Sequence, residues 1–326
     1  MTMQISPLGA ARLALTALAL TACTWASAWT DKPVKLIVPA PAGGTMDVVA
    51  RILADQIAAD IGQAVIVENK PGAGGAIAVQ SMLAVPADGQ TLMVTASNVL
   101  TEIPHVMKTS FDPLKDVRPI ATVARASMVL VGAPNLPAKD FAELTAYLKA
   151  NPGKLSFASY STGTSSHYAG MILNQKFGLD LTHAPFAGSP PALTQLMGGN
   201  ITIMFDGIVT SLPFHKAGKL KIFAVATKNR SAHLPQVPTL SEMGLPEFDF
   251  SNWLGVVASA KMPDAMADKI NAAILKAAAS PKVHERFTLA GFEPNTSLSA
   301  AQLAQSVRAE FDRNAALVKA FNIKLD

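Results

Sequence analysis

The chain has 326 residues and an apolar composition, with 50% hydrophobic and 15% charged residues. Its formal net charge of +4 is scattered, without a block of basic residues, which argues against a nucleic-acid partner. The length is enough for two compact domains, and after the N-terminus no apolar run reaches the ~18 residues of a membrane-spanning helix.

The first 28 residues have the pattern of an export signal. Arg12 precedes an apolar core at 13–22, and small residues provide a cleavage site after Ala28. A second interpretation stays open, because the letters LTAC that end at Cys23 resemble a bacterial lipoprotein signal, in which this cysteine would carry a lipid anchor. Both interpretations place the chain in the periplasm. Cys23 is the single cysteine, so we expect no disulfide in the exported chain.

Strand-like and helix-like segments alternate through most of the chain. The aliphatic run VKLIV at 34–38 is typical of a buried strand, and apolar residues at three-to-four spacing predict a helix over 46–61 that ends at Gly62. Two more strands are then expected at 64–68 and 91–95, with a helix between them at 75–84.

A second block continues the alternation. It predicts strands at 127–132, 155–159, 201–205 and 221–226, and helices at 141–150 and from about His167. After a proline-rich stretch we expect a strand at 254–259 and helices at 264–279 and 299–320. Alternation of this kind implies parallel sheets with helices on both faces, and the number of units favours two α/β domains over one.

Two loops share a position and a composition. The segments APAGGTMD at 40–47 and SYSTGTSSH at 159–167 each follow a strand and open a helix. Ligands of open α/β sheets bind beyond the carboxyl ends of the strands, so one loop from each block predicts a site between the domains. A helix N-terminus carries about half a positive charge and leaves N–H groups unpaired, and Gly43 and Gly44 let the backbone approach closely. The first loop can therefore bind a carboxylate without a cationic side chain.

Each loop also has a simpler interpretation. A Gly-Gly turn before a helix can be turn chemistry alone, and Asp47 either braces this turn or binds a donor on the ligand. The hydroxyls of the second loop can bind ligand oxygens, directly or through water, or can cap the helix that follows. These hydroxyls surround Gly163 and belong to Ser161, Thr162, Thr164, Ser165 and Ser166.

The sequence lacks the motifs of the common catalytic and cofactor sites. It contains no GxSxG nucleophile elbow, no HExxH zinc motif, no phosphate-binding P-loop and no GxGxxG dinucleotide motif. We therefore expect a protein that is not an enzyme and that holds no cofactor or metal. A periplasmic hydrolase stays an alternative that only turnover of a bound ester or amide would support.

Several motifs, in order, resemble the Bug (TctC-like) family, the extracytoplasmic receptors of tripartite tricarboxylate transporters. They include VPAPAGGTMDVVAR, VIVENKPGAGGAIA, SYSTGTSSH, APFAGSPPALTQLMGG and IMFDG, and they extend over essentially the whole exported chain. The resemblance implies a type II periplasmic-binding-protein fold, in which two α/β lobes joined by two crossovers enclose a ligand cleft. It places crossovers near 123–127 and 248–254, lobe 1 at 29–125 plus 250–326, and lobe 2 at 126–249.

The family binds carboxylic acids through loop backbone, hydroxyl groups and bridging waters. Carried onto this chain, the resemblance implies contacts from Gly43, Gly44 and Thr45 in lobe 1 and from Thr162, Gly163, Thr164, Ser165 and Ser166 in lobe 2. We expect the far end of the ligand to be recognised by Asn98, Phe186 and Asp206. Each of these three has an alternative role, as a turn residue, a core residue and a helix cap, respectively.

Ala40 departs from the family pattern, which usually has a bulky aromatic residue after the first Val-Pro. If this position lines the cleft, its small side chain leaves room for a larger acid, such as an aromatic one. We hypothesise that the ligand is a mono- or dicarboxylate, with an aromatic body as one option.

The expected function is capture of the acid by lobe closure and its delivery to the membrane permease of a tripartite tricarboxylate transporter. The alternative is a sensor that presents the closed form to a signalling receptor, and neighbouring permease or kinase genes would separate the two. A two-lobed receptor binds its ligand without a partner subunit, so we expect a monomer.

Overall fold

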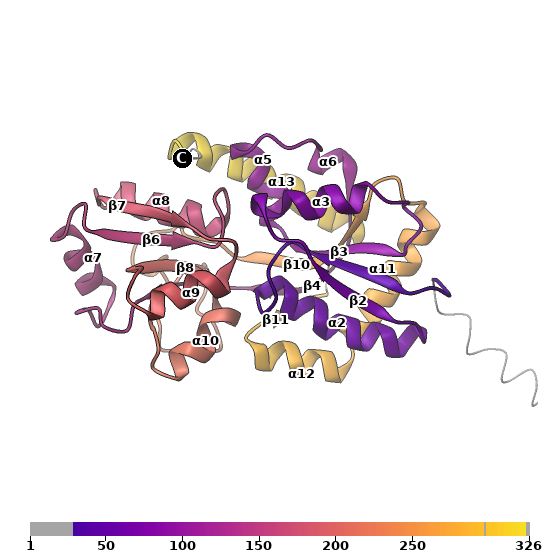
Figure 1. Ribbon diagram of the computed structural model, residues 1–326, viewed down its shortest axis with the longest axis horizontal. Coiled ribbons are helices and arrows are strands. Elements are labelled where there is room, and N and C mark those ends of the chain that lie inside the picture. Colours follow the sequence, from indigo (N-terminus) through magenta and orange to yellow (C-terminus); the bar gives the residue numbers. More distant parts are fainter. Residues whose placement is uncertain (1–28, 297, 324–326) are drawn as a thin grey trace, which may run out of the picture.

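The computed structural model describes residues 29–296 and 298–323. The expected export signal and the alternative lipid anchor at Cys23 lie outside the described residues. Figure 1 shows two α/β bodies side by side, with the chain crossing between them. Within the described ranges, no helix is both long enough and apolar enough to span a membrane.

The first body is built on a sheet with the strand order β11-β4-β10-β3-β1-β2. Its strands are β1 Val34–Val38, β2 Val65–Asn69, β3 Thr91–Ala96, β4 Val117–Ala126, β10 Asn252–Ser259 and β11 Glu293–Pro294. Its longer helices are α2 Thr45–Ile61, α3 Ala76–Leu83, α11 Asp264–Ala278, α12 Pro281–Ala290 and α13 Ala300–Ala320. Shorter helical segments are η2 Ala73–Gly75, α4 Asn98–Thr101, α5 Ile103–Val106 and α6 Pro113–Asp116.

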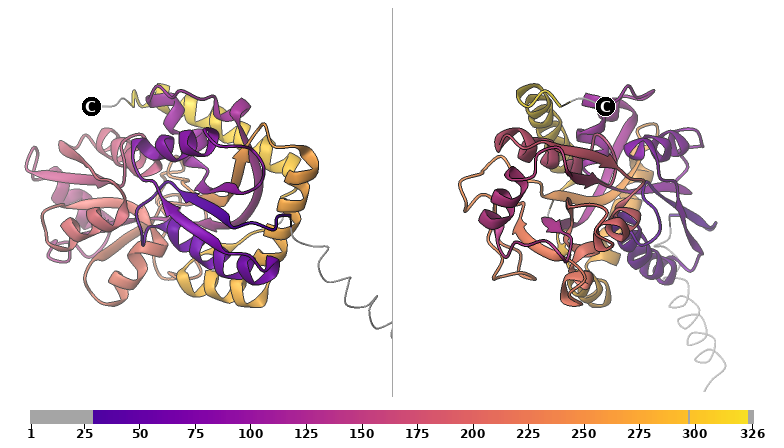
Figure 2. Two further views of the ribbon diagram at one scale, coloured as in Figure 1. Left: turned by 45° about the vertical axis from the view of Figure 1, so that its right-hand side comes forward. Right: turned by 60° about the vertical axis from the view of Figure 1, so that its left-hand side comes forward.

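The second body is built on a sheet with the strand order β7-β6-β8-β5-β9. Its strands are β5 Met128–Gly132, β6 Leu155–Ser159, β7 Leu181–Pro185, β8 Ile203–Gly207 and β9 Lys221–Val225. Its helices are α7 Phe141–Lys149, α8 Ser165–Lys176, α9 Ser189–Met197 and α10 Ile208–Lys216. Helix α13 packs on α4, α5 and β4 of the first body (Figure 2), and Val318 near its end packs against the core of the second body.

Strand β1 shows why its sequence is continuously apolar. Leu36 and Val38 pack into the core that contains residues of α2 and α11, whereas Ile37 packs on the other face, with residues of α3 and α13. Successive side chains of a strand point to opposite faces, and helices cover both faces of this sheet. Both sets of side chains are therefore buried, as the aliphatic run predicts.

The sheets are mixed rather than parallel, which corrects the sequence expectation. β1 is parallel to β2 and β3, and β6 is parallel to β7 and β8. However, β10 runs antiparallel to β3 and β4, and β5 runs antiparallel to β8 and β9. The reason is the path of the chain, because β5 and β10 are the strands that enter a sheet directly from the other body. An apolar run in the sequence does not show whether its strand runs parallel or antiparallel to its neighbours.

The chain crosses between the bodies at two adjacent points. β4 ends at Ala126 and β5 begins at Met128, with the buried Ser127 between them. The return path enters β10 at Asn252, which pairs with Ala126. The two connections therefore lie side by side next to the loops of both bodies, while the exact lobe boundaries stay a prediction.

Several elements were not expected from the sequence, and proline accounts for the clearest cases. β4 contains Pro119, although proline cannot donate a hydrogen bond in a strand ladder and usually argues against an interior strand. Helix α10 contains Pro213 in its interior. The segment α9 begins with Ser189 and two prolines, which is favourable at the first turn of a helix but resembles a loop in the sequence.

Candidate functional site

A cavity lies where loops of the two bodies meet. The first body contributes to its lining, among other residues, Ala40, Pro41, Gly44, Thr45, Asn98 and Leu254. The second body contributes, among others, Tyr160, Ser161, Thr164, Gly188, Ser189 and Gly207. The cavity has a volume of about 90 Å³, which is room for several water-sized groups. Of the residues predicted from the sequence, this lining includes Ala40, Gly44, Thr45, Asn98 and Thr164.

Two glycines of the second body lie directly against the first body at this cavity. A Cβ atom on Gly188 would lie 2.3 Å from the ring of Pro41, and a Cβ atom on Gly207 would lie 2.8 Å from Thr45 Oγ1. Gly188 also has a φ of +127°, which L side chains rarely adopt. The two bodies are thus in close contact around the cavity, and only the absence of side chains at these positions permits it.

Asp47 braces the first loop. Its carboxylate accepts hydrogen bonds from the N–H of Gly43 at 2.9 Å, from Arg51 Nε at 2.9 Å and from Asn69 Nδ2 at 2.8 Å. Asn69 Nδ2 also donates to the carbonyl of Ala40 at 2.9 Å. Burial alone would raise the pKa of Asp47, but these hydrogen bonds outweigh it and hold the pKa below its usual value. Asp47 and Gly43 are not part of the cavity lining, and the bracing interpretation describes their geometry.

The start of α2 presents backbone donors to the cavity. Gly44 is the N-cap residue, with an extended backbone, and Thr45 begins the helix. Both residues line the cavity, together with Met46. The first N–H groups of a helix have no intrahelical acceptor, and the helix dipole places partial positive charge beside them. The Gly44 N–H itself donates to the carbonyl of Pro41 at 3.1 Å. Anion binding at this helix start stays a prediction.

The first turn of α8 makes its hydrogen bonds inside the protein. Ser165 Oγ donates to Glu102 of the first body at 2.6 Å, and Ser166 Oγ donates to the carbonyl of Phe205 at 2.5 Å. The Ser165 N–H also donates to the Glu102 carboxyl, and the Ser166 N–H donates to the Tyr160 hydroxyl. Both serines are fully buried and neither is part of the cavity lining. This helix end thus faces groups of the protein itself.

The loop before α8 reaches the cavity through other residues. Ser161 and Thr164 line it, and Thr164 Oγ1 donates to the carbonyl of Ser161 at 2.6 Å. Gly163 has a φ of +81° and donates its N–H to His167 Nδ1 at 3.2 Å. Thr162 and Gly163 lie outside the lining. The hydrogen bond from Gly163 to His167 ties this loop to α8.

Asp206 is a buried brace in the second body. It accepts hydrogen bonds from Ser189 Oγ, from Thr210 Oγ1 at 2.6 Å and from Ser211 Oγ at 2.7 Å. Burial raises the pKa of Asp206, against the opposing effect of these hydrogen bonds. The carboxyl therefore ties the start of α9 to α10. Asp206 is not in the cavity lining, although its neighbour Gly207 is.

Asn98 and Phe186 differ in their relation to the cavity. Asn98 lines it, is 3% exposed, and its Oδ1 has no hydrogen-bond partner among the described residues. Phe186 packs against the large apolar core, and its neighbour Ala187 lines the cavity instead. The geometry of Phe186 is that of a core residue, whereas Asn98 has an amide available to a ligand.

The sequence predicted no role for Glu102, Tyr160, Gly188, Gly207 and Asn252. Glu102 is only 2% exposed, and burial raises its pKa to about 8 against the lowering effect of the hydrogen bonds from Ser165. A signal for Glu102 was present, because a single acid stands within the otherwise uncharged run VLTEIP. Nothing in the sequence indicates that Gly188 and Gly207 approach the other body.

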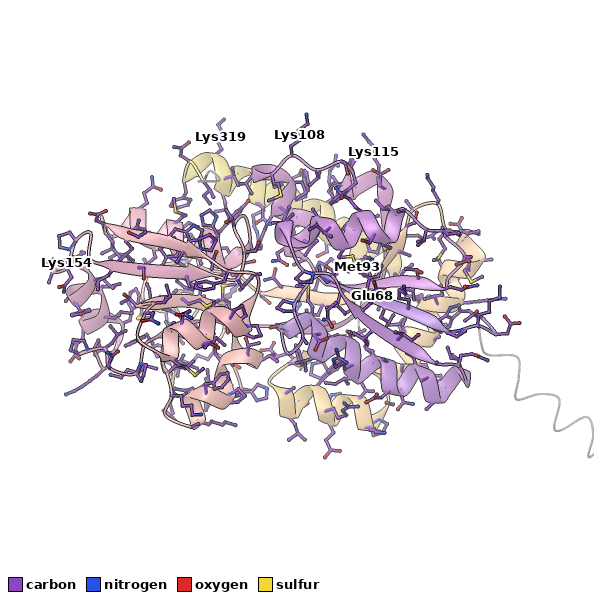
Figure 3. The ribbon with its side chains drawn as sticks, in the orientation of Figure 1. Glu68, Met93, Lys108, Lys115, Lys154 and Lys319 are labelled. Carbon is purple, nitrogen blue, oxygen red and sulfur yellow. The ribbon has the colours of Figure 1, made fainter. Side chains whose placement is uncertain are left out.

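The charge of the site comes from helix ends rather than side chains. Within the described chain, no Asp, Glu, Lys, Arg or His lines the cavity, and Figure 3 shows the labelled Lys108, Lys115, Lys154 and Lys319 pointing outward from the surface. The lining includes N-terminal residues of α2 and α9 and the N-cap residues of α8 and α10. Aligned helix dipoles make such a place favourable for an anion.

The described residues do not form a metal site, since none of them gather into a group of three or more His, Cys, Asp or Glu side chains. The lining has hydroxyl, amide and backbone donors and an apolar wall of Pro39, Ala40, Ala96, Ala126 and Leu254. Such a set can hold one polar or anionic group together with an apolar body. It does not provide a general base beside a nucleophile.

Comparison with known proteins identifies one family. The model of the tripartite tricarboxylate transporter family receptor matches residues 49–323. The solved periplasmic binding protein BugD is 30% identical, with a TM-score of 0.86 over 90% of this chain and 99% of that chain.

Two further solved relatives were determined with acids. MatC from Rhodopseudomonas palustris, with bound malate, is 31% identical, with a TM-score of 0.83 over 88% of this chain and 99% of that chain. Rpa4515 from R. palustris, with adipate, is 27% identical, with a TM-score of 0.86 over 91% of this chain and 99% of that chain. These likenesses confirm the expected two-lobed fold of a periplasmic binding protein. They also confirm the expectation of a solute-binding protein rather than an enzyme.

Proposed function

Since the chain belongs to the tripartite tricarboxylate transporter receptor family, we propose that it is a periplasmic receptor that captures a small carboxylic acid between its two bodies. The observation that carries this proposal is the cavity between them, lined by helix N-termini from both bodies and, among the described residues, by no Asp, Glu, Lys, Arg or His. A carboxylate suits that cavity because oriented N–H groups and helix dipoles supply its counter-charge. The relatives solved with malate and adipate support the same ligand class.

The contacts follow from the lining. We propose that Thr45, beside Gly44, holds the carboxylate from the first body. We also propose that the main-chain N–H groups of Thr164 and Ser189 hold it from the second body, since the hydroxyls of both residues already donate inside the protein. Asn98 then binds a polar group on the far part of the ligand. The other residues predicted from the sequence shape the loops behind these contacts, namely Gly43, Asp47, Thr162, Gly163, Ser165, Ser166, Phe186 and Asp206.

The body of the ligand lies against the apolar wall. Ala40 is part of that wall, where the family usually has an aromatic side chain, so the cavity has room for a larger body. The proposed ligands are mono- and dicarboxylates with aliphatic or aromatic bodies.

Capture requires the two bodies to act as lobes. We assign residues 29–125 plus 250–326 to lobe 1 and 126–249 to lobe 2, with the adjacent crossings at Ser127 and Asn252 as hinges. A ligand that contacts both lobes favours the closed state by its differential affinity. The closed receptor, a monomer, delivers the acid to a transporter permease. A sensor that presents the closed form to a signalling receptor is the alternative.

A thermal-shift screen tests this function. Malate, adipate and benzoate are added to the purified protein at a large excess. A ligand that binds only the folded state stabilises it by about 2.7 kcal/mol at 100 times its dissociation constant, which raises the midpoint by several degrees. A shift with at least one acid is expected. No shift with any acid of a wider panel would contradict a carboxylate receptor.

A further inference from the structure

Glu102 joins the two bodies next to the cavity. It lies between α4 and α5 of the first body, and it is 2% exposed. Ser165 Oγ, in the first turn of α8, donates to its Oε1 at 2.6 Å. Tyr168, one turn further along the same helix, donates its hydroxyl to the backbone carbonyl of Glu102 at 3.0 Å. The second body is thus attached through both the side chain and the main chain of one glutamate.

The Glu102 carboxyl acts as the cap of a helix in the other body. The N-cap residue of α8 is Thr164, but its hydroxyl donates to Ser161 and makes no capping bond to the helix. The Ser165 N–H instead donates to the Glu102 carboxyl. Orphan N–H groups at a helix start need acceptors, and a carboxyl group is a favourable one. For α8, that acceptor is the side chain of Glu102, which belongs to the other body and lies far earlier in the chain.

This cap connects to the cavity through one side chain. Asn252 lines the cavity and stands where the chain re-enters the first body. Its Nδ2 donates to Ser165 Oγ at 3.1 Å, and its Oδ1 accepts from Ser97 Oγ at 2.9 Å. A ligand that contacts Asn252 is therefore two hydrogen bonds away from the Glu102 carboxyl. The same helix end carries Thr164, which lines the cavity.

We propose that Glu102 is a positioning residue for ligand capture, which fastens the first turn of α8 to the first body and so holds the arrangement in which Thr164 and Tyr160 line the cavity. This inference rests on the proposed function, because it assumes that the bodies separate and meet again around an acid. In this proposal, the two bodies are held together by the ligand and also by the Glu102 contact, which lies outside the cavity.

The surroundings of Glu102 make this contact sensitive to pH. Burial raises its pKa to about 8, the Ser165 hydrogen bonds oppose that rise, and among the charged groups Glu310 adds to it while Arg313 opposes it. Oε2 has no partner among the described residues, so ionisation there is not compensated. The titratable and charged groups around it are Glu310 and Arg313 on α13, Tyr160 and Tyr168 in the second body, and His105 on α5.

The direction of the pH effect follows from linkage. When the bodies separate, water reaches the carboxyl group and its pKa falls towards the ordinary value of about 4.3. Closure then takes up a proton between that value and about 8. The stabilisation of the closed state is present at the low end of this window and is lost as the pH rises through the raised pKa. Acid binding should therefore weaken between pH 6.5 and pH 9.

Calorimetry on matched variants tests the proposal. The dissociation constants of malate, adipate and benzoate are measured at pH 6.5 and pH 9 for wild type, Glu102→Gln, Glu102→Ala and, as control, Glu285→Gln, which changes an exposed glutamate of α12. Glu102→Gln keeps the acceptor for Ser165 but cannot ionise, so its affinity should stay near the wild-type pH 6.5 value at both pH values. Wild type and Glu285→Gln should weaken by about tenfold at pH 9. Glu102→Ala should bind about tenfold more weakly at pH 6.5, where wild type holds the cap.

Equal affinities and equal pH dependence for wild type and both Glu102 variants would overturn the proposal, while binding of any acid by wild type would leave the proposed function intact. If wild type binds no acid, the proposed function fails and X-ray scattering decides the positioning role alone. Glu102→Ala and Ser165→Ala should then have a larger radius of gyration than wild type at pH 6.5. An unchanged radius in both variants would contradict the role, and Ser165→Ala serves if Glu102→Ala does not fold.

Discussion

At the scale of single residues, two buried carboxylates hold the loops around the cavity without lining it. Asp47 accepts hydrogen bonds from Gly43, Arg51 and Asn69 in the first body, and Asp206 accepts hydrogen bonds from three hydroxyls in the second. In the proposed function, these carboxyl groups stay behind the loops, and the helix N–H groups at the cavity bind the anion. The acidic residues near the site are thus compatible with binding an acid.

Removing the Asp47 brace should destabilise the fold. Asp47→Ala loses three hydrogen bonds to a charged group, and we expect the free energy of unfolding to fall by about 2 kcal/mol at pH 7. Because the pKa of Asp47 is lowered in the folded state, its contribution is present above the unfolded-state pKa of about 4 and is lost as the pH falls through the lowered value. Urea unfolding of wild type and variant at pH 7 and pH 3 measures both effects.

Asp55→Ala is the matched control on the same helix. Asp55 pairs with Arg286 at 2.7 Å, but its side chain is 60% exposed, so its removal should cost less than about 1 kcal/mol. A cost for Asp47→Ala no larger than that of the control would show that the brace is unimportant.

In the proposed function, Ala40 sets how large a ligand body the cavity accepts. Ala40→Phe places a ring against the apolar wall, and we expect at least about tenfold weaker binding of benzoate with little change for malate, because overpacking costs about 1–3 kcal/mol. Titration calorimetry of both acids with both proteins measures the difference. Unchanged binding of a bulky acid that wild type prefers would refute the role of Ala40.

The sequence placed single residues correctly at a helix start where the chemistry is local. The Gly-Gly turn places Gly44 and Thr45 at a helix start that lines the cavity, as the loop sequence indicates. The sequence also shows that Ser165 and Ser166 stand at a helix start, but it cannot show that the acceptor of Ser165 is Glu102, 63 positions away in the chain. Hydrogen-bond partners that lie far apart in the chain therefore determine which donors remain for a ligand.

At the scale of elements, the close approach of the bodies depends on helix starts without side chains. Gly207 is the N-cap of α10, with a φ of −65° and a ψ of 137°, a conformation open to any residue. Only the proximity of Thr45 restricts this position. A substitution at Gly207 therefore tests the contact between the bodies without adding backbone strain.

Gly207→Ser should weaken acid binding while leaving the fold intact. Serine is a favourable N-cap residue, so α10 should keep its stability. Its Cβ would lie 2.8 Å from Thr45 Oγ1 and would push the bodies apart, so we expect at least about tenfold weaker binding. Calorimetry with the acid selected by the screen measures this. Gly198→Ser, whose Cβ would lie 3.4 Å from the nearest atom at the end of α9, should bind as wild type does. Equal losses in the two variants would contradict the contact argument.

The elements that periodicity predicts best are those with one buried face and a clear end. The helix expected over 46–61 is observed as α2 at Thr45–Ile61, and Gly62 ends it with a φ of 68°. The strand expected at 155–159 is β6. Strand β4 was missed because Pro119 and two arginines interrupt its apolar pattern. Strand direction was wrong for β5 and β10 because the path between the bodies, rather than local sequence, sets it.

At the scale of the whole molecule, the proposed function joins the two-lobed fold to a cavity whose lining has no cationic side chain among the described residues. The chain crosses twice at adjacent points, which suits the proposed hinge between the lobes. In the proposed function, helix ends from both lobes complete the site when the lobes meet. The family resemblance supplied this architecture from the sequence, whereas the partition of hydroxyls between ligand and protein required the three-dimensional contacts.

The most direct test compares each acid with its uncharged amide. Calorimetry on wild type measures the dissociation constants of the best acid of the screen and of the matching amide, using the pairs adipate and adipamide, malate and malamide, or benzoate and benzamide. Hydrogen bonds to a charged group are worth about 1.5–3 kcal/mol against about 1 kcal/mol for neutral partners, so the account predicts that the amide binds at least about tenfold more weakly. Equal affinity of acid and amide would contradict recognition of a carboxylate by the helix ends.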